Sequence, residues 1–156
     1  MNYLNKIAKI LIENNLKIST TESCTGGLLS SKLTDISGSS AFITLNLITY
    51  SNEAKERMLN VIFDKDGAVS ENCSYQMAKG LSTLTKSDIC ISTTGIAGPT
   101  GGTKDKPVGL MYSTIYTQKK YKTYKIQVES NLSRTEIKER FTNEVLKNLY
   151  NFLLSL

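Results

Sequence analysis

The run Lys17-Ile18-Ser19-Thr20-Thr21-Glu22-Ser23-Cys24-Thr25-Gly26-Gly27 joins a β-branched segment to a pair of glycines. Its first part, residues 17–22, predicts a short strand because isoleucine and threonine favour extended backbone. Residues 25–36 predict a helix that carries the glycines in its first turn and leucines on one face. A strand that passes directly into a helix is the building unit of α/β folds.

The rest of the chain continues this alternation of helices and strands. Helical spacing and capping signals predict further helices at residues 3–15, 51–59 and 70–84, and from residue 133 nearly to the end. Strands are predicted at residues 42–50, 88–94, 108–117 and 122–128, the last two as a hairpin, and loops at residues 63–69 and 95–107. We therefore expect one domain over residues 1–156, an α/β fold with three layers (α/β/α) and a mixed, mostly parallel sheet.

The composition is that of an ordinary globular domain, with 40% apolar and 21% charged residues. The first residues form no apolar signal segment, and no apolar run approaches the ~18 residues of a membrane helix. We therefore expect a cytoplasmic protein with no membrane partner. The three cysteines, Cys24, Cys73 and Cys90, are scattered and include no CxxC pair, which indicates reduced thiols.

The net charge of +5 comes from 19 basic and 14 acidic residues. Lysines crowd one stretch, at Lys104, Lys106, Lys119, Lys120, Lys122 and Lys125. Such a patch suits an anionic ligand or a nucleic acid, but it also protects an exposed sheet edge from pairing with other strands. We expect these lysines to protect a sheet edge. We expect no nucleic-acid partner, because the chain has no zinc finger, RNA-recognition signature or long basic helix.

The chain contains no histidine, which excludes a Ser-His-Asp triad and a Cys-His pair. Ser23 lies where the first strand passes into a helix, and the N–H groups of that helix start are candidate oxyanion donors. If Ser23 is a nucleophile, its base must be a lysine, a tyrosine or a carboxylate. An ordinary helix-capping serine is the alternative, and Cys24 is the rival nucleophile.

A base is offered by the run Thr49-Tyr50-Ser51-Asn52-Glu53-Ala54-Lys55, in which Ser51 caps a predicted helix. Lys55 would lie near the first turn of that helix, where the partial positive charge and burial both lower the pKa of an amine. Tyr50 could relay the proton or hydrogen-bond the serine. The alternative is a solvated lysine beside a sheet-edge tyrosine, with Glu53 only complementing the helix dipole.

The segment Gly95-Ile96-Ala97-Gly98-Pro99-Thr100-Gly101-Gly102 holds four of the ten glycines. It follows a predicted buried strand, which is where α/β folds bind ligands. It is neither a Walker A loop nor a GxGxxG motif. Its glycines allow backbone N–H groups to converge on an anion, so we expect this loop to line a ligand site. A flexible loop is the alternative.

Six segments together resemble the CinA C-terminal-domain family, whose enzymatic members are nicotinamide-nucleotide amidases. They are residues 22–27, 35–40, 49–55, 67–70, 95–99 and 106–109, and they keep the family's order and spacing. The resemblance implies a Ser-Lys amidase, without metal or cofactor, that converts nicotinamide mononucleotide to nicotinate mononucleotide and ammonia. It implies Ser23 as nucleophile, Lys55 as general base, Tyr50 as an assisting hydroxyl, and a homodimer or higher homo-oligomer.

The same resemblance makes Ser40 a further active-site serine. The substrate contacts that we expect are Thr25, Gly26, Gly27, Ser40, Thr94, Gly95, Gly98, Gly101 and Arg134. The family usually has Gly-Asp-Arg before its last helix, whereas this chain has Leu132-Ser133-Arg134, with Lys138 at the next basic position. Arg134 keeps a bidentate fork for phosphate, and Lys138 offers a point charge. A non-catalytic nucleotide-binding module and a Ser-Lys hydrolase of another amide or ester stay open as alternatives.

Overall fold

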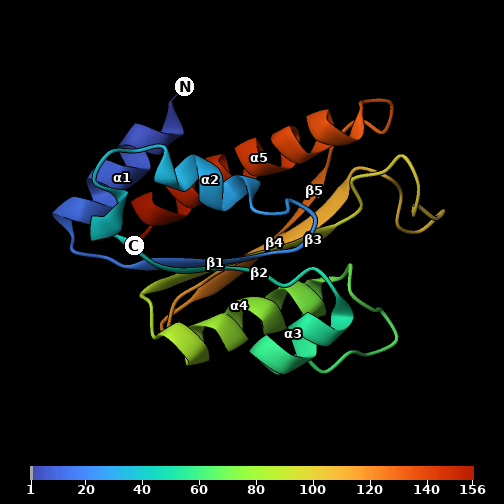
Figure 1. Cartoon of the computed structure of the whole chain (residues 1–156), viewed down its shortest axis with the longest axis horizontal. Coiled ribbons are helices and arrows are strands. Elements are labelled where there is room, and N and C mark those ends of the chain that lie inside the picture. Colours follow the sequence, from blue (N-terminus) through green and yellow to red (C-terminus); the bar gives the residue numbers. More distant parts are fainter. Residues whose placement is uncertain (1) are drawn as a thin grey trace.

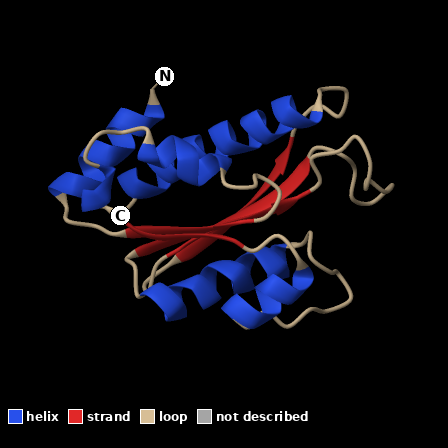
Figure 2. Ribbon diagram, in the orientation of Figure 1, coloured by secondary structure: helices blue, strands red, loops and turns tan. Residues whose placement is uncertain are grey.

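The computed structural model describes residues 2–156, in which a five-stranded sheet lies between two layers of helices (Figure 1). The elements are α1 (Tyr3–Glu13), β1 (Ile18–Glu22), α2 (Leu28–Thr34), η1 (Ser39–Ala41), β2 (Ile43–Ile48), α3 (Asn52–Leu59), α4 (Glu71–Thr85), β3 (Ile89–Gly95), β4 (Leu110–Tyr116), β5 (Tyr121–Gln127) and α5 (Arg134–Leu154). Helices α1, α2 and α5 cover one face of the sheet, and α3 and α4 cover the other (Figure 2). The predicted three-layer architecture is confirmed.

The strand order is β2-β1-β3-β4-β5. Strand β1 pairs in parallel with both β2 and β3, whereas β4 is antiparallel to both β3 and β5. Among the described strands β4 alone therefore runs against the others, as the prediction of a mixed, mostly parallel sheet requires. The register sets Glu22 opposite Ile48 on one side and Thr93 on the other. The carboxyl ends of β1, β2 and β3 consequently meet at one edge of the sheet, where α/β folds bind ligands.

Each face of the sheet has its own apolar core. Ile7, Leu29 and Phe141 are fully buried under α1, α2 and α5, and Met77 and Leu81 are buried under α4 on the other face. Burying each such side chain stabilises the fold by roughly 1.5–3 kcal/mol. Over residues 2–156, none of the helices combines the length and the apolar character needed to cross a membrane.

Hydroxyl side chains fill the middle of the sheet on the α4 face. Ser74 Oγ lies 3.0 Å from Ser92 Oγ and 2.8 Å from Thr114 Oγ1, which in turn lies 2.7 Å from Thr123 Oγ1. Because a hydroxyl both donates and accepts, such a chain satisfies buried polar groups without water. Within residues 2–156, Ser113 Oγ is the one buried side-chain nitrogen or oxygen that has no hydrogen-bond partner.

The predicted start of one helix was wrong, and the other predicted ends of helices and strands agree with the structure within two residues. Helix α2 begins at Leu28 rather than Thr25, because Gly26 and Gly27 have φ angles of 59° and 100°. Only glycine adopts this left-handed backbone freely, so the pair forms a turn that precedes the helix. Strand β2 begins at Ile43, after the short 3₁₀ turn η1.

Candidate active site

The site lies at the sheet edge where β1, β2 and β3 end. Ser23 follows β1, Tyr50 lies just beyond β2, and Thr94 and Gly95 end β3. These ends surround a cavity of about 260 Å³. Its lining consists of Ser23, Cys24, Tyr50, Asn52, Lys55, Ala68, Val69, Thr94, Gly95, Ile96, Ala97, Gly98, Thr100, Gly101 and Arg134. The parallel strands thus bring together segments that are far apart in the sequence.

Ser23 and Lys55 form a hydrogen-bonded pair in this cavity. The Ser51 side chain accepts from the Ala54 N–H and so begins α3, which sets Lys55 one turn into the helix. Lys55 Nζ lies 3.1 Å from Ser23 Oγ and donates to the Tyr50 carbonyl oxygen at 2.9 Å. The Ser23 hydroxyl has the same carbonyl oxygen within 3.3 Å. The alternative of a solvated lysine is therefore wrong.

Lys55 is 1% exposed, and it makes no ion pair within residues 2–156. Burial lowers the pKa of its amine, and the nearby Cys73 and Cys24 thiols oppose this shift only in part. Removing water disfavours the charged form of an amine, and no carboxylate pairs with it to restore that form. The arrangement therefore favours a neutral amine that can accept the proton of the serine hydroxyl.

Cys24, the rival nucleophile, also lines the cavity, but its surroundings favour the protonated thiol over the reactive thiolate. Burial raises the pKa of its thiol from 9.0 to about 12. A hydrogen bond with Thr93 opposes this shift, and the Glu22 carboxylate adds to it. Since the thiolate is the reactive form of cysteine, this thiol stays protonated and poorly nucleophilic at neutral pH.

The N–H groups at the start of α2 are already occupied, which contradicts the expected oxyanion donors there. The Glu22 carboxylate accepts from the N–H groups of Gly27, Leu29 and Ser30 at 3.2, 2.9 and 3.0 Å. A ligand oxygen would have to displace this buried carboxylate. The N–H of Cys24, the residue after the serine, makes no hydrogen bond to another residue in the described range 2–156 and lies beside the cavity.

Tyr50 and Arg134 meet at the mouth of the cavity. The Tyr50 hydroxyl lies 3.1 Å from Arg134 Nη2, and Arg134 Nη1 donates to the Gly98 carbonyl oxygen at 2.6 Å. The hydroxyl therefore contacts the arginine, and the backbone carbonyl of Tyr50, rather than its side chain, contacts Ser23 and Lys55. Arg134 joins the start of α5 to the glycine-rich loop and the end of β2.

The structure sorts the expected substrate contacts into two groups. Thr94, Gly95, Gly98, Gly101 and Arg134 line the cavity, whereas Thr25, Gly26, Gly27 and Ser40 do not. Thr25 is buried, and its hydroxyl donates to Glu22 and contacts Thr93. At Gly26, a Cβ would lie 3.5 Å from Lys138 Nζ, so the second basic residue of α5 is beside the turn and not in the cavity lining.

Ser40 lies at the opposite end of the sheet from Ser23. It belongs to η1, which precedes β2, and β2 runs parallel to β1 with Ile43 opposite Ile18. Lys17, just before β1, donates to the carbonyl oxygen of Ala41 beside it. The expected placement of Ser40 in this cavity is therefore wrong, because the residues that precede a parallel strand lie at the edge away from the site.

Several lining residues lie in the motifs quoted above but were not among the predicted substrate contacts. Asn52, Ala68, Val69 and Thr100 belong to this group. Asn52 is the first residue of α3, so the Ser51 cap would have placed it near Lys55 once the lysine was chosen. Ala68 and Val69 come from the connection between α3 and α4, and only the tertiary fold shows that it returns to the end of β3.

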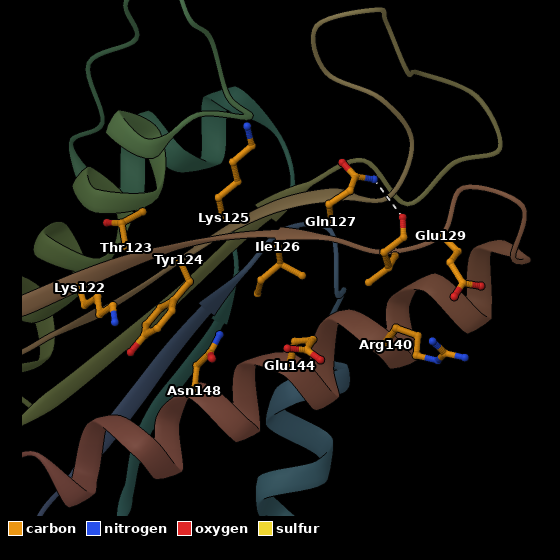
Figure 3. A pocket seen from close by; sticks show the side chains of 11 residues that line it. Lys122, Thr123, Tyr124, Lys125, Ile126, Gln127, Glu129, Arg140, Glu144 and Asn148 are labelled. Atoms are coloured by element: carbon orange, nitrogen blue, oxygen red, sulfur yellow. Dashed lines mark hydrogen bonds between the residues drawn. The ribbon is translucent and has the colours of Figure 1, made fainter.

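A larger hollow, about 600 Å³, lies elsewhere, between β5 and α5 (Figure 3). Lys122 and Arg140 line it together with Glu129 and Glu144, so its charges are mixed (Figure 3). It contains no buried nucleophile and lies along an edge strand rather than at the strand ends. His, Cys, Asp and Glu side chains nowhere gather in groups of three or more that could hold a metal within residues 2–156.

The sequence matches a family model described as the CinA C-terminal domain over residues 2–153. A CinA-like protein of Chlorobium limicola is 41% identical over 155 residues, which cover 94% of this chain and 36% of that protein. The chain thus spans about a third of the length of the curated relatives that it matches.

Solved structures share the whole fold. The competence/damage inducible protein CihA from Agrobacterium tumefaciens is 34% identical, with a TM-score of 0.86 over 96% of this chain and 94% of that one. A competence-damaged protein (CinA) superfamily protein from Enterobacter cloacae is 29% identical, with a TM-score of 0.91 over 97% of this chain and 90% of that one. The family model, the relatives and the shared fold agree, and the chain belongs to the CinA C-terminal-domain family.

Proposed function

We propose that this chain is an amidase that hydrolyses the carboxamide of nicotinamide mononucleotide to nicotinate mononucleotide and ammonia. The observation that carries the chemistry is the 3.1 Å contact between Ser23 Oγ and the buried Lys55 Nζ in a chain without histidine. A neutral amine beside a hydroxyl is a nucleophile with its general base. The choice of substrate comes from the resemblance of the motifs to the amidase members of the family.

In the first half of the reaction, Ser23 Oγ attacks the carboxamide carbon and its proton passes to Lys55 Nζ. The resulting ammonium of Lys55 then gives this proton to the departing nitrogen, so that ammonia leaves and an acyl-enzyme remains. In the second half, neutral Lys55 takes a proton from water and the hydroxide adds to the ester carbon; the C–O bond to Ser23 then breaks, Lys55 returns the proton to Ser23 Oγ, and the acid leaves. The carbonyl oxygen of Tyr50 holds Lys55 Nζ in place throughout.

The oxyanion of each tetrahedral intermediate needs donors near Ser23. The α2 N–H groups are bound to Glu22, so they are not free for this purpose. We assign the N–H of Cys24 as one donor because it follows the nucleophile and lines the cavity. The glycine-rich loop supplies the opposite wall through Gly95 and Gly98.

Arg134 is the group that we assign to the phosphate. Its guanidinium has five N–H donors, and its protein contacts in residues 2–156 are with neutral oxygens of Gly98 and Tyr50. It makes no ion pair with a carboxylate of the described residues, so an incoming phosphate would be its first anionic partner. Lys138, one turn further along α5, adds positive charge nearby.

The test is ammonia release by the purified protein from nicotinamide mononucleotide, nicotinamide riboside and free nicotinamide, each with and without a chelator. We expect turnover of the mononucleotide alone, unchanged by the chelator. Ser23→Ala should lose nearly all turnover and still bind the mononucleotide, while Cys24→Ala keeps substantial activity. Binding without ammonia release by the unmodified protein would instead indicate a regulatory module. An inactive Cys24→Ala beside an active Ser23→Ala would refute the serine assignment.

A further inference from the structure

Glu22, the residue before the nucleophile, has a buried side chain with an unusual set of partners. It is 0% exposed and makes no ion pair within residues 2–156. Its two oxygens accept hydrogen bonds from Thr25 Oγ1, Gly27 N, Leu29 N, Ser30 N and Ser30 Oγ. Donors alone therefore surround the carboxylate, which is the arrangement that offsets the loss of water around a buried negative charge.

These partners span the whole turn that carries Ser23. Glu22 Oε1 accepts from the Thr25 hydroxyl at 2.6 Å and from the Leu29 N–H at 2.9 Å, on either side of the two glycines with left-handed backbone. The Thr25 hydroxyl also lies 2.9 Å from Thr93 Oγ1, and Thr93 accepts the N–H of Ser23. The carboxylate thus fastens the turn directly to α2, and through the Thr25 hydroxyl to β3, beside the direct hydrogen bond from the Ser23 N–H to the Thr93 carbonyl oxygen.

We propose that Glu22 is a positioning residue, whose carboxylate holds the turn so that Ser23 Oγ stays within reach of Lys55 Nζ. The inference rests on the proposed function, since it takes Ser23 as the nucleophile. Glu22 is not one of the residues that line the cavity, and the groups that shift the pKa of Lys55 do not include it. It acts on the serine through geometry and leaves the proton affinity of the base unchanged.

Glu22→Gln is the informative substitution because it keeps the shape and changes the hydrogen bonding. One carboxylate oxygen becomes an NH₂ group, which then faces donors whichever way the amide is turned. The turn must rearrange to relieve this conflict. Thr25→Val is the milder variant, because it removes the hydroxyl that joins Glu22 to Thr93 and keeps the carboxylate.

The closing experiment measures the nucleophilicity of Ser23 with an alkyl fluorophosphonate, whose reaction does not depend on the natural substrate. Ser23 Oγ bonds to phosphorus, the P–F bond breaks, fluoride leaves, and Lys55 takes the hydroxyl proton. We expect Glu22→Gln to lower the labelling rate about 100-fold, the order reached when a reacting group is misplaced by ~1 Å. Thr25→Val should lower it by a smaller factor.

Two controls separate positioning from general loosening of the fold. Leu33→Val trims the buried core under the same helix and leaves the Glu22 contacts intact, so its labelling rate should match the unmodified protein. When the labelling rate is plotted against pH, Glu22→Gln should show the same midpoint as the unmodified protein and a lower maximal rate. A shifted midpoint would show that Glu22 acts by charge on Lys55, and it would overturn the proposal.

The remaining outcomes are also decisive. If a folded Glu22→Gln variant were labelled as fast as the unmodified protein, the positioning assignment would be overturned. If the glutamine variant does not fold, the same result in Thr25→Val would overturn it. Slow labelling of Glu22→Gln beside fast labelling of Leu33→Val would support it, even if nicotinamide mononucleotide released no ammonia, and then only the substrate would be wrong. Failure to label Ser23 in the unmodified protein would overturn the nucleophile and both proposals with it.

Discussion

At the scale of single residues, Lys55 differs from an ordinary buried lysine because it has no carboxylate partner in residues 2–156. Its hydrogen bonds go to one carbonyl oxygen and one hydroxyl, both neutral. Leaving an amine without a counter-ion is costly for the charged form and lowers the pKa. Functional sites retain stability penalties of this kind, and in the proposed mechanism the neutral amine is the reactive state.

The first prediction concerns the identity of the base. If neutral Lys55 accepts the serine proton, the rate should rise with pH along a limb centred below the ~10.4 of free lysine. Lys55→Arg should be almost inactive, because guanidinium keeps its proton although the charge is preserved. Lys55→Met should be equally inactive and folded. The measurement is the rate of ammonia release as a function of pH. Normal turnover by Lys55→Arg would refute the assignment, and Tyr50 would then be the next base to test.

A second residue-scale prediction compares two buried serines on adjacent strands. Ser92 Oγ contacts Ser74 and accepts the N–H of Thr114, so Ser92→Ala should cost about 1–3 kcal/mol of unfolding free energy by leaving these groups unsatisfied. Ser113 Oγ has no partner in residues 2–156, so Ser113→Ala should change stability by less than ~0.5 kcal/mol or raise it. Denaturant titration of both variants is the measurement, and equal losses would contradict the hydrogen-bond assignment.

At the scale of elements, the approach of α3 to α4 depends on a glycine inside a helix. A Cβ at Gly80 would lie 2.1 Å from the carbonyl oxygen of Leu59, at the end of α3. Replacing a glycine in a helix interior by alanine ordinarily stabilises the helix by about 1 kcal/mol. Here the backbone of the neighbouring helix occupies the space, and a backbone atom cannot move as a flexible side chain does.

We therefore predict that Gly80→Ala destabilises the protein, by about 1–3 kcal/mol, the usual range for overpacking. Thr83→Ala is the matched control, because Thr83 is an exposed position of the same helix, where alanine raises helix propensity. Thermal or denaturant unfolding should move in opposite directions for the two variants. A stabilising Gly80→Ala would show that α3 is free to move away from α4.

The strand–turn–helix unit from β1 to α2 shows the same dependence on tertiary contacts. Gly26 and Gly27 form a left-handed turn ahead of the helix, and the Glu22 side chain reaches across it to the first N–H groups of α2. A capping residue adjacent to the helix would have been visible in the sequence. A carboxylate that caps from the preceding strand has no comparable signature.

At the scale of the whole molecule, the buried ionisable groups predict how stability depends on pH. Lys55 has a lowered pKa when folded, so between that value and ~10.4 the unfolded chain binds more protons than the folded one. Stability should therefore rise with pH through that window. The thiols act oppositely, because burial raises the pKa of Cys24 to about 12 and those of Cys73 and Cys90 to about 11, from 9.0.

Above pH ~9 the unfolded chain loses thiol protons that the folded chain keeps, so stability should fall. Urea unfolding at a series of pH values should give a curve that rises and then declines. Lys55→Met should flatten the rising part of the curve. Cys90 lies away from the site, so Cys90→Ala should weaken the decline and leave the rise unchanged. A decline that persists at full slope in Cys90→Ala would exclude that thiol as a contributor.

The sequence by itself determined the element order and the layers, and its resemblance to the family named Ser23 and Lys55 as the central pair of the proposed chemistry. Local periodicity and capping residues set the helices and strands, because side-chain spacing and backbone hydrogen bonding are short-range effects. The absence of histidine left lysine, tyrosine or a carboxylate as the base for Ser23. The Ser51 cap then placed Lys55 on a helix start, and the structure sets the pair 3.1 Å apart.

Only the tertiary structure decided which expected contacts share a cavity and how charge is distributed around them. Ser40 was predicted to be near Ser23, but η1 precedes β2 and lies at the other edge of a parallel sheet. The Tyr50 hydroxyl contacts Arg134, and the Glu22 carboxylate accepts hydrogen bonds from the N–H groups of α2. These results depend on strand register, chain direction and burial, which join residues distant in sequence and leave no trace in local patterns.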